Sequence, residues 1–161
     1  MKTLLILRHA KSSWNNANLS DHDRPLNERG KLDAPRVGEI LKEHHLIPDL
    51  IITSTAEGAL ATAEAAAIHS DYAREIKIER RFYHAPPSTY LAVLRELGDG
   101  PDRVMVVGHN PGLEDLVSHL TGESEFMPTA ALAQVELSIT RWSSLNETTQ
   151  GKLAFLWRPK G

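Results

Sequence analysis

Two histidines and an arginine stand where short apolar runs of the sequence end. Arg8 and His9 follow the run 4–7, and His109 closely follows the run 104–107. Such runs are typical of strands buried on both faces of a sheet. Because ligands of open α/β sheets collect beyond the carboxyl ends of the strands, we expect these three side chains to meet at one sheet edge. The histidines at positions 22, 44, 45, 69 and 119 follow no such strand, and we interpret them as surface residues.

The chemistry that suits this set is phosphoryl transfer through a covalent phosphohistidine. A neutral imidazole can attack phosphorus and hold the phosphoryl group, and we take His9 as this nucleophile. A backbone carbonyl is the expected acceptor that fixes the proton on its other ring nitrogen. The guanidinium of Arg8 matches phosphate oxygens in a bidentate manner, and His109, protonated or donating, can stabilise charge on the equatorial oxygens. Pro111 fits the first position of the following helix, which would aim its free amides at the same place.

The composition limits the classes of protein to which the chain can belong. It has 161 residues, so we expect a single domain over 1–161. A net charge of −3 argues against a general nucleic-acid or membrane surface. The lack of cysteine excludes disulfides, thiolate metal sites and a cysteine nucleophile. No apolar run approaches the roughly 18 residues of a membrane span, and the start does not resemble a signal peptide, so we expect a cytoplasmic protein.

Strand and helix patterns alternate along the chain. Strands are predicted at 4–7, 50–54, 76–79, 104–107, 133–140 and 152–157, and helices at 27–45, 56–69, 88–97 and 111–121. In the first helix, Leu32, Val37, Ile40 and Leu41 form the predicted apolar stripe, and we expect a kink or break at Pro35. The last two strands have no helix between them and would form a hairpin. We therefore predict an α/β fold with a central mixed, mostly parallel sheet between helical layers.

Three motifs together resemble one family. They read Arg8-His9-Ala10-Lys11-Ser12, then Asp23-Arg24-Pro25-Leu26-Asn27-Glu28-Arg29-Gly30, then Gly108-His109-Asn110-Pro111. In this order and spacing they are similar to the SixA branch, the small phosphohistidine phosphatases, of the histidine phosphatase superfamily. The resemblance implies a phosphoglycerate mutase-like three-layer α/β sandwich, a phosphorylated His9, a phosphate held by Arg8 and His109, and no metal or other cofactor. It places Arg24 in a loop that lines the pocket, where a loop-to-helix salt bridge is the alternative role.

One position departs from the family pattern. The family carries a second arginine after the second strand, four residues before a threonine, and here Gly58 stands four residues before Thr62. Because charge-assisted hydrogen bonds are worth about 1.5–3 kcal/mol each, this loss should weaken the phosphate site. Lys11, Arg24 or Arg29 could substitute as phosphate ligands. Alternatively, the protein is slow, or it binds phosphate with little turnover.

The sequence identifies no clear general acid. The candidates are Glu79, His84, Asp21 and Asp23, and each such residue is more often a surface group. The lack of a clear general acid favours substrates with a P–N bond over those with a P–O bond. A leaving imidazole needs less help from an acid, because its conjugate acid has a pKa of about 6.5.

The compact size of the chain indicates the kind of substrate. No insertion is long enough to form a lid, so we expect a phosphohistidine-bearing partner protein, such as a phosphotransfer domain, and phosphate ion as the product. The alternatives are a small-molecule phosphomonoesterase and a weakly active or inactive member of the family that binds phosphate or a phosphoprotein. A metal enzyme fits poorly, since His9 and His109 lack a carboxylate partner of recognisable spacing.

Overall fold

A mixed sheet runs through the molecule. A computed structural model describes residues 1–160. Along the chain the strands are β1 (Lys2–Arg8), β2 (Leu50–Thr53), β3 (Ile76–Ile78), β4 (Arg103–Gly108), β5 (Leu132–Leu137) and β6 (Gly151–Trp157). Their order in the sheet is β3-β2-β4-β1-β5-β6. The first four strands along the chain are parallel to one another. β5 runs antiparallel to β1, and β6 pairs with β5 as the predicted hairpin. The prediction of a mixed, mostly parallel sheet is confirmed.

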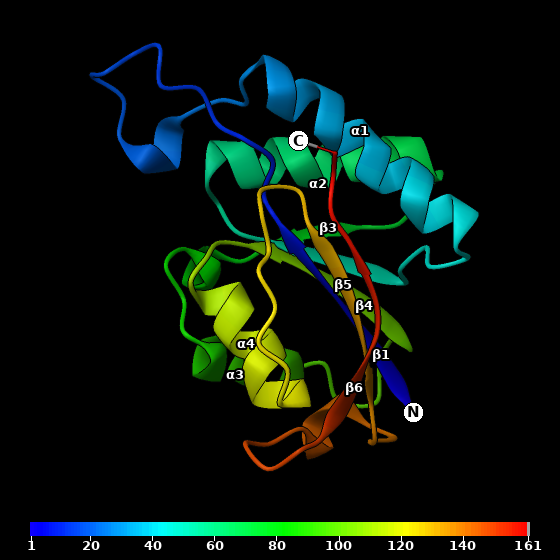
Figure 1. The fold of residues 1–161 in the computed structure, drawn as a ribbon. Coiled ribbons are helices and arrows are strands. Elements are labelled where there is room, and N and C mark those ends of the chain that lie inside the picture. Colours follow the sequence, from blue (N-terminus) through cyan, green and yellow to red (C-terminus); the bar gives the residue numbers. More distant parts are fainter. Residues whose placement is uncertain (161) are drawn as a thin grey trace.

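Helices cover both faces of this sheet. They are α1 (Glu28–Glu43), α2 (Glu57–Ser70), α3 (Pro87–Arg95) and α4 (Gly112–Thr121), and short 3-10 turns lie at Asp21–Asp23, Arg80–Phe82 and Trp142–Ser144. α1 and α2 pack together over one face, and α3 and α4 cover the other (Figure 1). The predicted three-layer α/β architecture is therefore confirmed. None of the helices in residues 1–160 has the length and apolar character that a membrane span requires.

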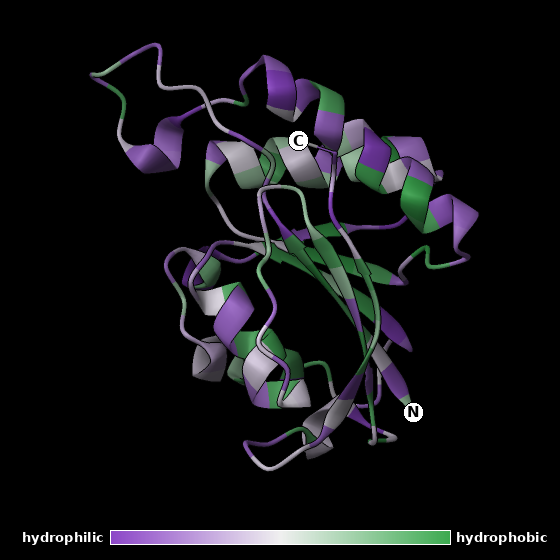
Figure 2. Ribbon diagram, in the orientation of Figure 1, coloured by the Kyte–Doolittle hydropathy of each residue, from purple (hydrophilic) through white to green (hydrophobic). Residues whose placement is uncertain are grey.

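The apolar run of β1 serves two cores at once. Leu4 and Ile6 pack with α3 and α4, whereas Leu5 and Leu7 pack with α1 and α2, and all four side chains are fully buried. Figure 2 shows the hydrophobic strands between helices whose outer surfaces are more polar. Because both faces of β1 are buried, its register is fixed and its carboxyl end is held in place.

α1 differs in detail from its prediction. Asn27 caps the helix by accepting a hydrogen bond from the amide of Gly30 at 2.8 Å. The helix continues through Pro35, so the expected break is wrong: only one backbone hydrogen bond is lost in a helix of 16 residues. It ends two residues early, because His45 adopts a left-handed φ of 56°. Leu32 is 68% exposed, since it lies about 200° around the helix from the buried Ala34.

Candidate functional site

Parallel strands end side by side and deliver the predicted site residues. Arg8 on β1 lies opposite Gly108 on β4. The amide of His9 donates to the carbonyl of Gly108 at 3.1 Å, and the amide of Ser54, after β2, donates to the carbonyl of Val107 at 3.0 Å. These bonds bring His9 and the residue after Gly108, His109, to a ring-centroid separation of 5.0 Å. The sheet register thus explains how residues a hundred positions apart in the sequence meet.

His9 is held in one tautomer. Its Nδ1 lies 2.7 Å from the carbonyl of Ala10. Because a carbonyl only accepts, Nδ1 carries the proton and Nε2 keeps the lone pair. Burial lowers the pKa of His9; the hydrogen bond to Ala10 opposes this shift, and the charge of Arg8 adds to it. The ring is therefore neutral at neutral pH, the state that nucleophilic attack on phosphorus requires.

His109 is a buried and neutral histidine. Its Nε2 lies 2.8 Å from Oγ of Ser54, which also accepts from the amide of Ala56 at 3.3 Å. We assign the hydroxyl proton of Ser54 to this bond, which leaves the ring proton of His109 on Nδ1. Burial, followed by the proximity of His9 and His84, lowers the pKa of His109 to about 3. Of the two roles left open by the sequence, the protonated and the donating one, the lowered pKa argues against the protonated one.

Arg8 has an unused hydrogen-bonding group beside the histidines. Its Nη1 donates to the carbonyl of Met127 at 3.0 Å. The backbone of Met127 is itself held by the side chains of Asn110 and Glu114, at 2.9 and 2.7 Å. Within residues 1–160, Nε of Arg8 is buried and has no partner. Since an unpaired buried donor costs about 1–3 kcal/mol, an anion at this place would be stabilised.

The helix after His109 begins one residue later than predicted. α4 starts at Gly112, and Pro111 precedes it. The amide of Leu113 donates to the carbonyl of His109 at 3.1 Å, and the next amide lies 3.3 Å from Oδ1 of Asn110. Both amides are therefore already used within the turn. The expectation that they point freely at the phosphate site is wrong.

Gly58 leaves a small hollow beside His9. A Cβ placed on Gly58 would lie 2.7 Å from Oγ of Ser12 and 3.7 Å from Nδ1 of His9. The carbonyl of Gly58 accepts from Oγ1 of Thr62 at 2.6 Å, and Thr62 accepts from the amide of Ala10 at 2.9 Å. These bonds fix the first turn of α2 against the residue that follows the nucleophile candidate. The hollow has a volume of only about 10 Å³ and is lined by His9, Ser12, Asp21, Ala56, Gly58, Ala59 and His109.

The basic residues that could replace the family arginine lie outside this hollow. Nη1 of Arg24 donates to a loop carbonyl at 3.3 Å, and its guanidinium stacks 3.7 Å from the ring centroid of Trp14. Arg29 is paired with Asp33 on α1 at 2.8 Å. Lys11 is exposed and lines neither this hollow nor the groove next to His109. The structure therefore brings Arg8, His9 and His109 together, but not Lys11, Arg24 or Arg29.

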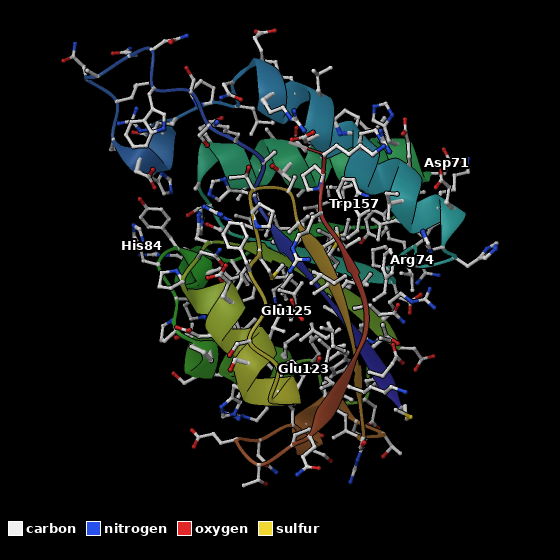
Figure 3. All side chains as sticks on the ribbon, in the orientation of Figure 1. Asp71, Arg74, His84, Glu123, Glu125 and Trp157 are labelled. Carbon is white, nitrogen blue, oxygen red and sulfur yellow. The ribbon has the colours of Figure 1, made fainter. Side chains whose placement is uncertain are left out.

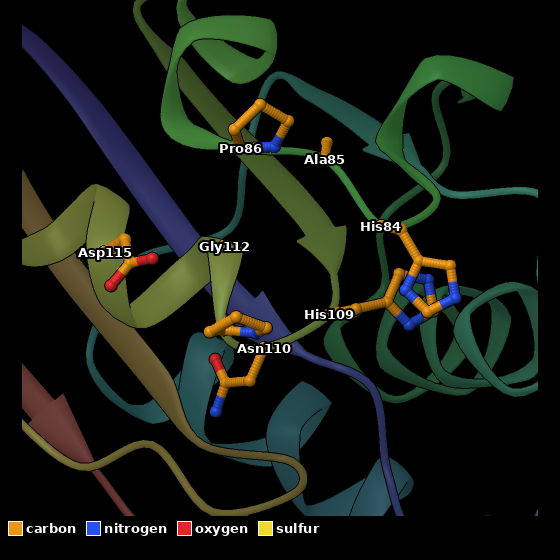
Figure 4. A pocket seen from close by; sticks show the side chains of 8 residues that line it. His84, Ala85, Pro86, His109, Asn110, Gly112 and Asp115 are labelled. Carbon is orange, nitrogen blue, oxygen red and sulfur yellow. The ribbon is translucent and has the colours of Figure 1, made fainter.

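A wider groove opens on the other side of His109. It has a volume of about 250 Å³, with His84 and His109 at one end and Asp115 at the other (Figure 4). The ring of His84 lies 6.2 Å from that of His109, and the ring of Tyr83 meets His109 edge-on at 5.3 Å. In Figure 3, His84 lies on one side of the view and Asp71, the C-cap residue of α2, on the other, so the groove lies far from the C-terminal end of α2.

Two of the four acid candidates lie beside the histidine pair. Asp21 lines the hollow, and His84 lines the groove. Glu79 is buried and paired with Arg81 at 2.8 Å, and this hydrogen bonding lowers the pKa of the carboxyl group. Asp23 is paired with the adjacent histidine at 3.1 Å. Glu79 and Asp23 are thus engaged elsewhere.

Sequence reasoning missed the residues that support the site. The sequence placed Thr62 only as the threonine of the family pattern, and its bond to the amide of Ala10 depends on the fold. His22, interpreted as a surface residue, is partly buried; its Nε2 lies 2.9 Å from Oγ1 of Thr55, and its ring meets Tyr83 at 4.9 Å. No local spacing links positions 22, 55 and 83, so the pattern of the sequence carried no signal for this contact.

Comparison with known proteins decides the family. The model of the histidine phosphatase superfamily (branch 1) matches residues 4–83, which include Arg8, His9 and Gly58. An uncharacterised chloroplast protein of Arabidopsis thaliana is 32% identical over 155 residues, which cover 88% of this chain and 69% of that protein. The chain belongs to the histidine phosphatase superfamily.

Solved structures place this histidine phosphatase in the SixA-type branch. A protein of Agrobacterium tumefaciens named for phosphohistidine phosphatase SixA is 27% identical, with a TM-score of 0.84 and 98% of each chain covered. The protein histidine phosphatase SixA complexed with tungstate is 22% identical, with a TM-score of 0.82 over 97% of this chain and 96% of that one. The phosphoglycerate mutase-like fold predicted from the sequence is confirmed.

Proposed function

We propose that this histidine phosphatase hydrolyses phosphohistidine on a partner protein through a covalent phospho-His9 intermediate. The observation that carries the proposal is the bond between Nδ1 of His9 and the carbonyl of Ala10 at 2.7 Å, which leaves the lone pair on Nε2. A neutral imidazole fixed in this tautomer, next to the unpaired Nε of Arg8 and the donor His109, has the parts that phosphoryl transfer needs.

In the first step, Nε2 of His9 forms a bond to phosphorus while the P–N bond of the substrate breaks. The electron pair of that bond goes to the substrate imidazole, which takes a proton from solvent. The carbonyl of Ala10 stabilises the positive charge that His9 gains. Arg8 binds the phosphoryl oxygens through Nε, and His109 donates from Nδ1. In the second step, water attacks phosphorus, the bond to His9 breaks, its electron pair returns to Nε2, and phosphate ion leaves with the proton balance taken up by solvent.

The lack of a dedicated general acid supports a substrate with a P–N bond. The conjugate acid of a leaving imidazole has a pKa of about 6.5, so this leaving group needs less help than an alkoxide. Asp21 and His84 are the candidates beside the histidine pair, and neither is held as a dedicated acid by a buried partner. These candidates offer little help to an oxygen leaving group, which supports a substrate with a P–N bond.

The groove next to His109 suits a segment of another protein. It is wide enough for side chains, and Pro86, Asn110, Pro111 and Asp115 are among the residues that line it. We propose that the residues around the substrate phosphohistidine lie here. Arg24 and Lys11 remain proposed phosphate ligands only if the loop after β1 rearranges. We also propose that the reaction needs no metal ion and takes place in the cytoplasm.

A comparison of substrates tests the function. We expect the wild type to hydrolyse a phosphohistidine peptide with a higher kcat/KM than p-nitrophenyl phosphate, both with and without a chelator. A preference for the aryl ester would favour a small-molecule phosphomonoesterase. Tight vanadate binding without turnover of either substrate would favour a phosphate-binding protein, the alternative that Gly58 supports.

A further inference from the structure

The ring of His84 is free to contact a ligand next to the phosphate site. It is exposed, and within residues 1–160 its nitrogens make no hydrogen bond. It packs against the ring of Tyr83 at a centroid separation of 4.0 Å and lies 6.2 Å from the ring of His109. The rest of its surface lines the end of the groove that it shares with His109 (Figure 4). His84 therefore presents an aromatic ring that no group of the chain covers completely.

The backbone holds this ring in place through an unfavourable conformation. His84 has a left-handed φ of 54°, which residues other than glycine seldom adopt. Its neighbours enforce it, because Phe82 is fully buried, Ala85 is 6% exposed, and Pro86 caps α3. Residues of this kind persist where the surrounding structure imposes them, and they gather at functional sites. The conformation of His84 thus indicates a function for its exposed ring.

Close packing against α4 fixes the other side of the groove. A Cβ on Gly112 would lie 2.0 Å from the carbonyl oxygen of Ala85, so only glycine permits this contact. The contact ties the segment that carries His84 to the turn that follows His109. The two histidines therefore keep a fixed spacing at the end of the groove.

Only one of the two cavities described beside His109 can take a further ring. The hollow at Gly58 has a volume of about 10 Å³, room for about one water molecule, whereas the groove has about 250 Å³. A cavity of roughly 150 Å³ is enough for benzene, so the groove can hold an imidazole. The ring of a substrate phosphohistidine would therefore lie on the side of His109 where His84 stands.

We propose that His84 determines substrate choice by stacking on the imidazole ring of the substrate phosphohistidine. This inference rests on the proposed function. Tyr83 supports His84 from the other side, so little freedom is lost when the substrate ring binds. Because the stacked ring is present both before and after the P–N bond breaks, the contact stabilises the bound substrate and the transition state alike. It therefore lowers KM and leaves kcat nearly unchanged.

Three substitutions separate stacking from hydrogen bonding or proton donation. His84→Phe keeps an aromatic face without an N–H group, His84→Gln keeps an N–H donor without an aromatic face, and His84→Ala removes both. With a phosphohistidine peptide, KM should rise about fivefold in His84→Ala and His84→Gln, the size of effect expected for one aromatic pair. His84→Phe should stay within about twofold of the wild type, and so should kcat in all three. His119→Ala is the matched control at an exposed histidine away from the groove.

A substrate without a ring supplies the second measurement. Phosphoramidate has a P–N bond but no imidazole, so its kcat/KM should differ by less than about twofold among the wild type and the three variants. An unchanged KM for the peptide in His84→Ala, a His84→Phe variant as defective as His84→Ala, or an equal loss with phosphoramidate would overturn the inference and leave the proposed function standing. A wild type that hydrolyses p-nitrophenyl phosphate but not the phosphohistidine peptide would overturn both.

Discussion

The two walls of the phosphate site are built in different ways. On the strand wall, β1 and β4 end in register, and the hydrogen bond from the amide of His9 to the carbonyl of Gly108 fixes the positions of Arg8, His9 and His109. On the loop wall, the segment after β1 meets the first turn of α2, where Gly58 offers no side chain and Ser12 partly covers the gap.

The difference separates the groups that carry out the reaction from those that set its rate. The strand wall holds the groups that we propose to form and break bonds to phosphorus, and the buried sheet keeps them in place. The loop wall is where a second cation would balance the phosphate charge, and Gly58 leaves that position without a side chain. We therefore expect substitutions on the strand wall to abolish the reaction, and substitutions on the loop wall to tune its rate.

The largest effect is expected for His9→Ala. Without the nucleophile no covalent intermediate forms, and kcat with a phosphohistidine peptide should fall on the order of a thousandfold or more. His119→Ala, at an exposed histidine near the end of α4, is the matched control and should keep the wild-type rate. Retention of full activity by His9→Ala, in a variant whose circular dichroism spectrum is unchanged, would contradict the assignment.

A smaller loss is expected for His109→Gln. Glutamine can still donate a hydrogen bond but cannot keep the position of Nδ1, so kcat should fall by roughly a hundredfold. Ser54→Ala removes the hydroxyl that orients the ring and should cost less, about tenfold, because the imidazole itself remains. If Ser54→Ala were as damaging as His109→Gln, the hydroxyl would have a direct part in the reaction.

On the loop wall, Gly58→Arg should raise the rate. The new guanidinium would lie opposite Arg8, and kcat with a phosphohistidine peptide lacking basic residues should increase about tenfold. The new Cβ is close only to Oγ of Ser12, which can rotate away. Gly58→Ala is the control for the added atoms, and an equal gain in Gly58→Ala would show that charge is not the cause.

Acid should destabilise the protein through His109. Its pKa is about 3 in the folded chain, against an ordinary value of 6.5, so below pH 6.5 the unfolded chain binds a proton that the folded chain does not. The free energy of unfolding should therefore fall as the pH decreases from 6.5 towards 3, by at most about 1.4 kcal/mol per pH unit from this group. In urea titrations, His109→Gln should show a shallower decrease than the wild type. An identical pH dependence of both would contradict the neutral, buried state of His109.

The sequence predicted the strand wall better than the loop wall. Apolar runs locate buried strands, and a residue that follows such a run must leave the sheet at its edge, so Arg8, His9 and His109 could be found from position alone. The interpretation of Arg24 or Arg29 as substitutes for the missing arginine depended on side-chain directions in a polar loop, which sequence spacing does not determine. Arg24 stacks on Trp14, and Arg29 pairs with Asp33.

The central claim, that His9 is the nucleophile, can be tested by trapping the intermediate. The wild type is mixed briefly with a phosphohistidine substrate and quenched in alkali, in which the P–N bond survives. After digestion with a protease that cleaves only after lysine, mass spectrometry locates the phosphate. We predict a phosphoryl group on His9 in the peptide 3–11, absent in His9→Ala. Turnover without any phosphorylated enzyme, or a phosphoryl group on His109 instead, would contradict the account.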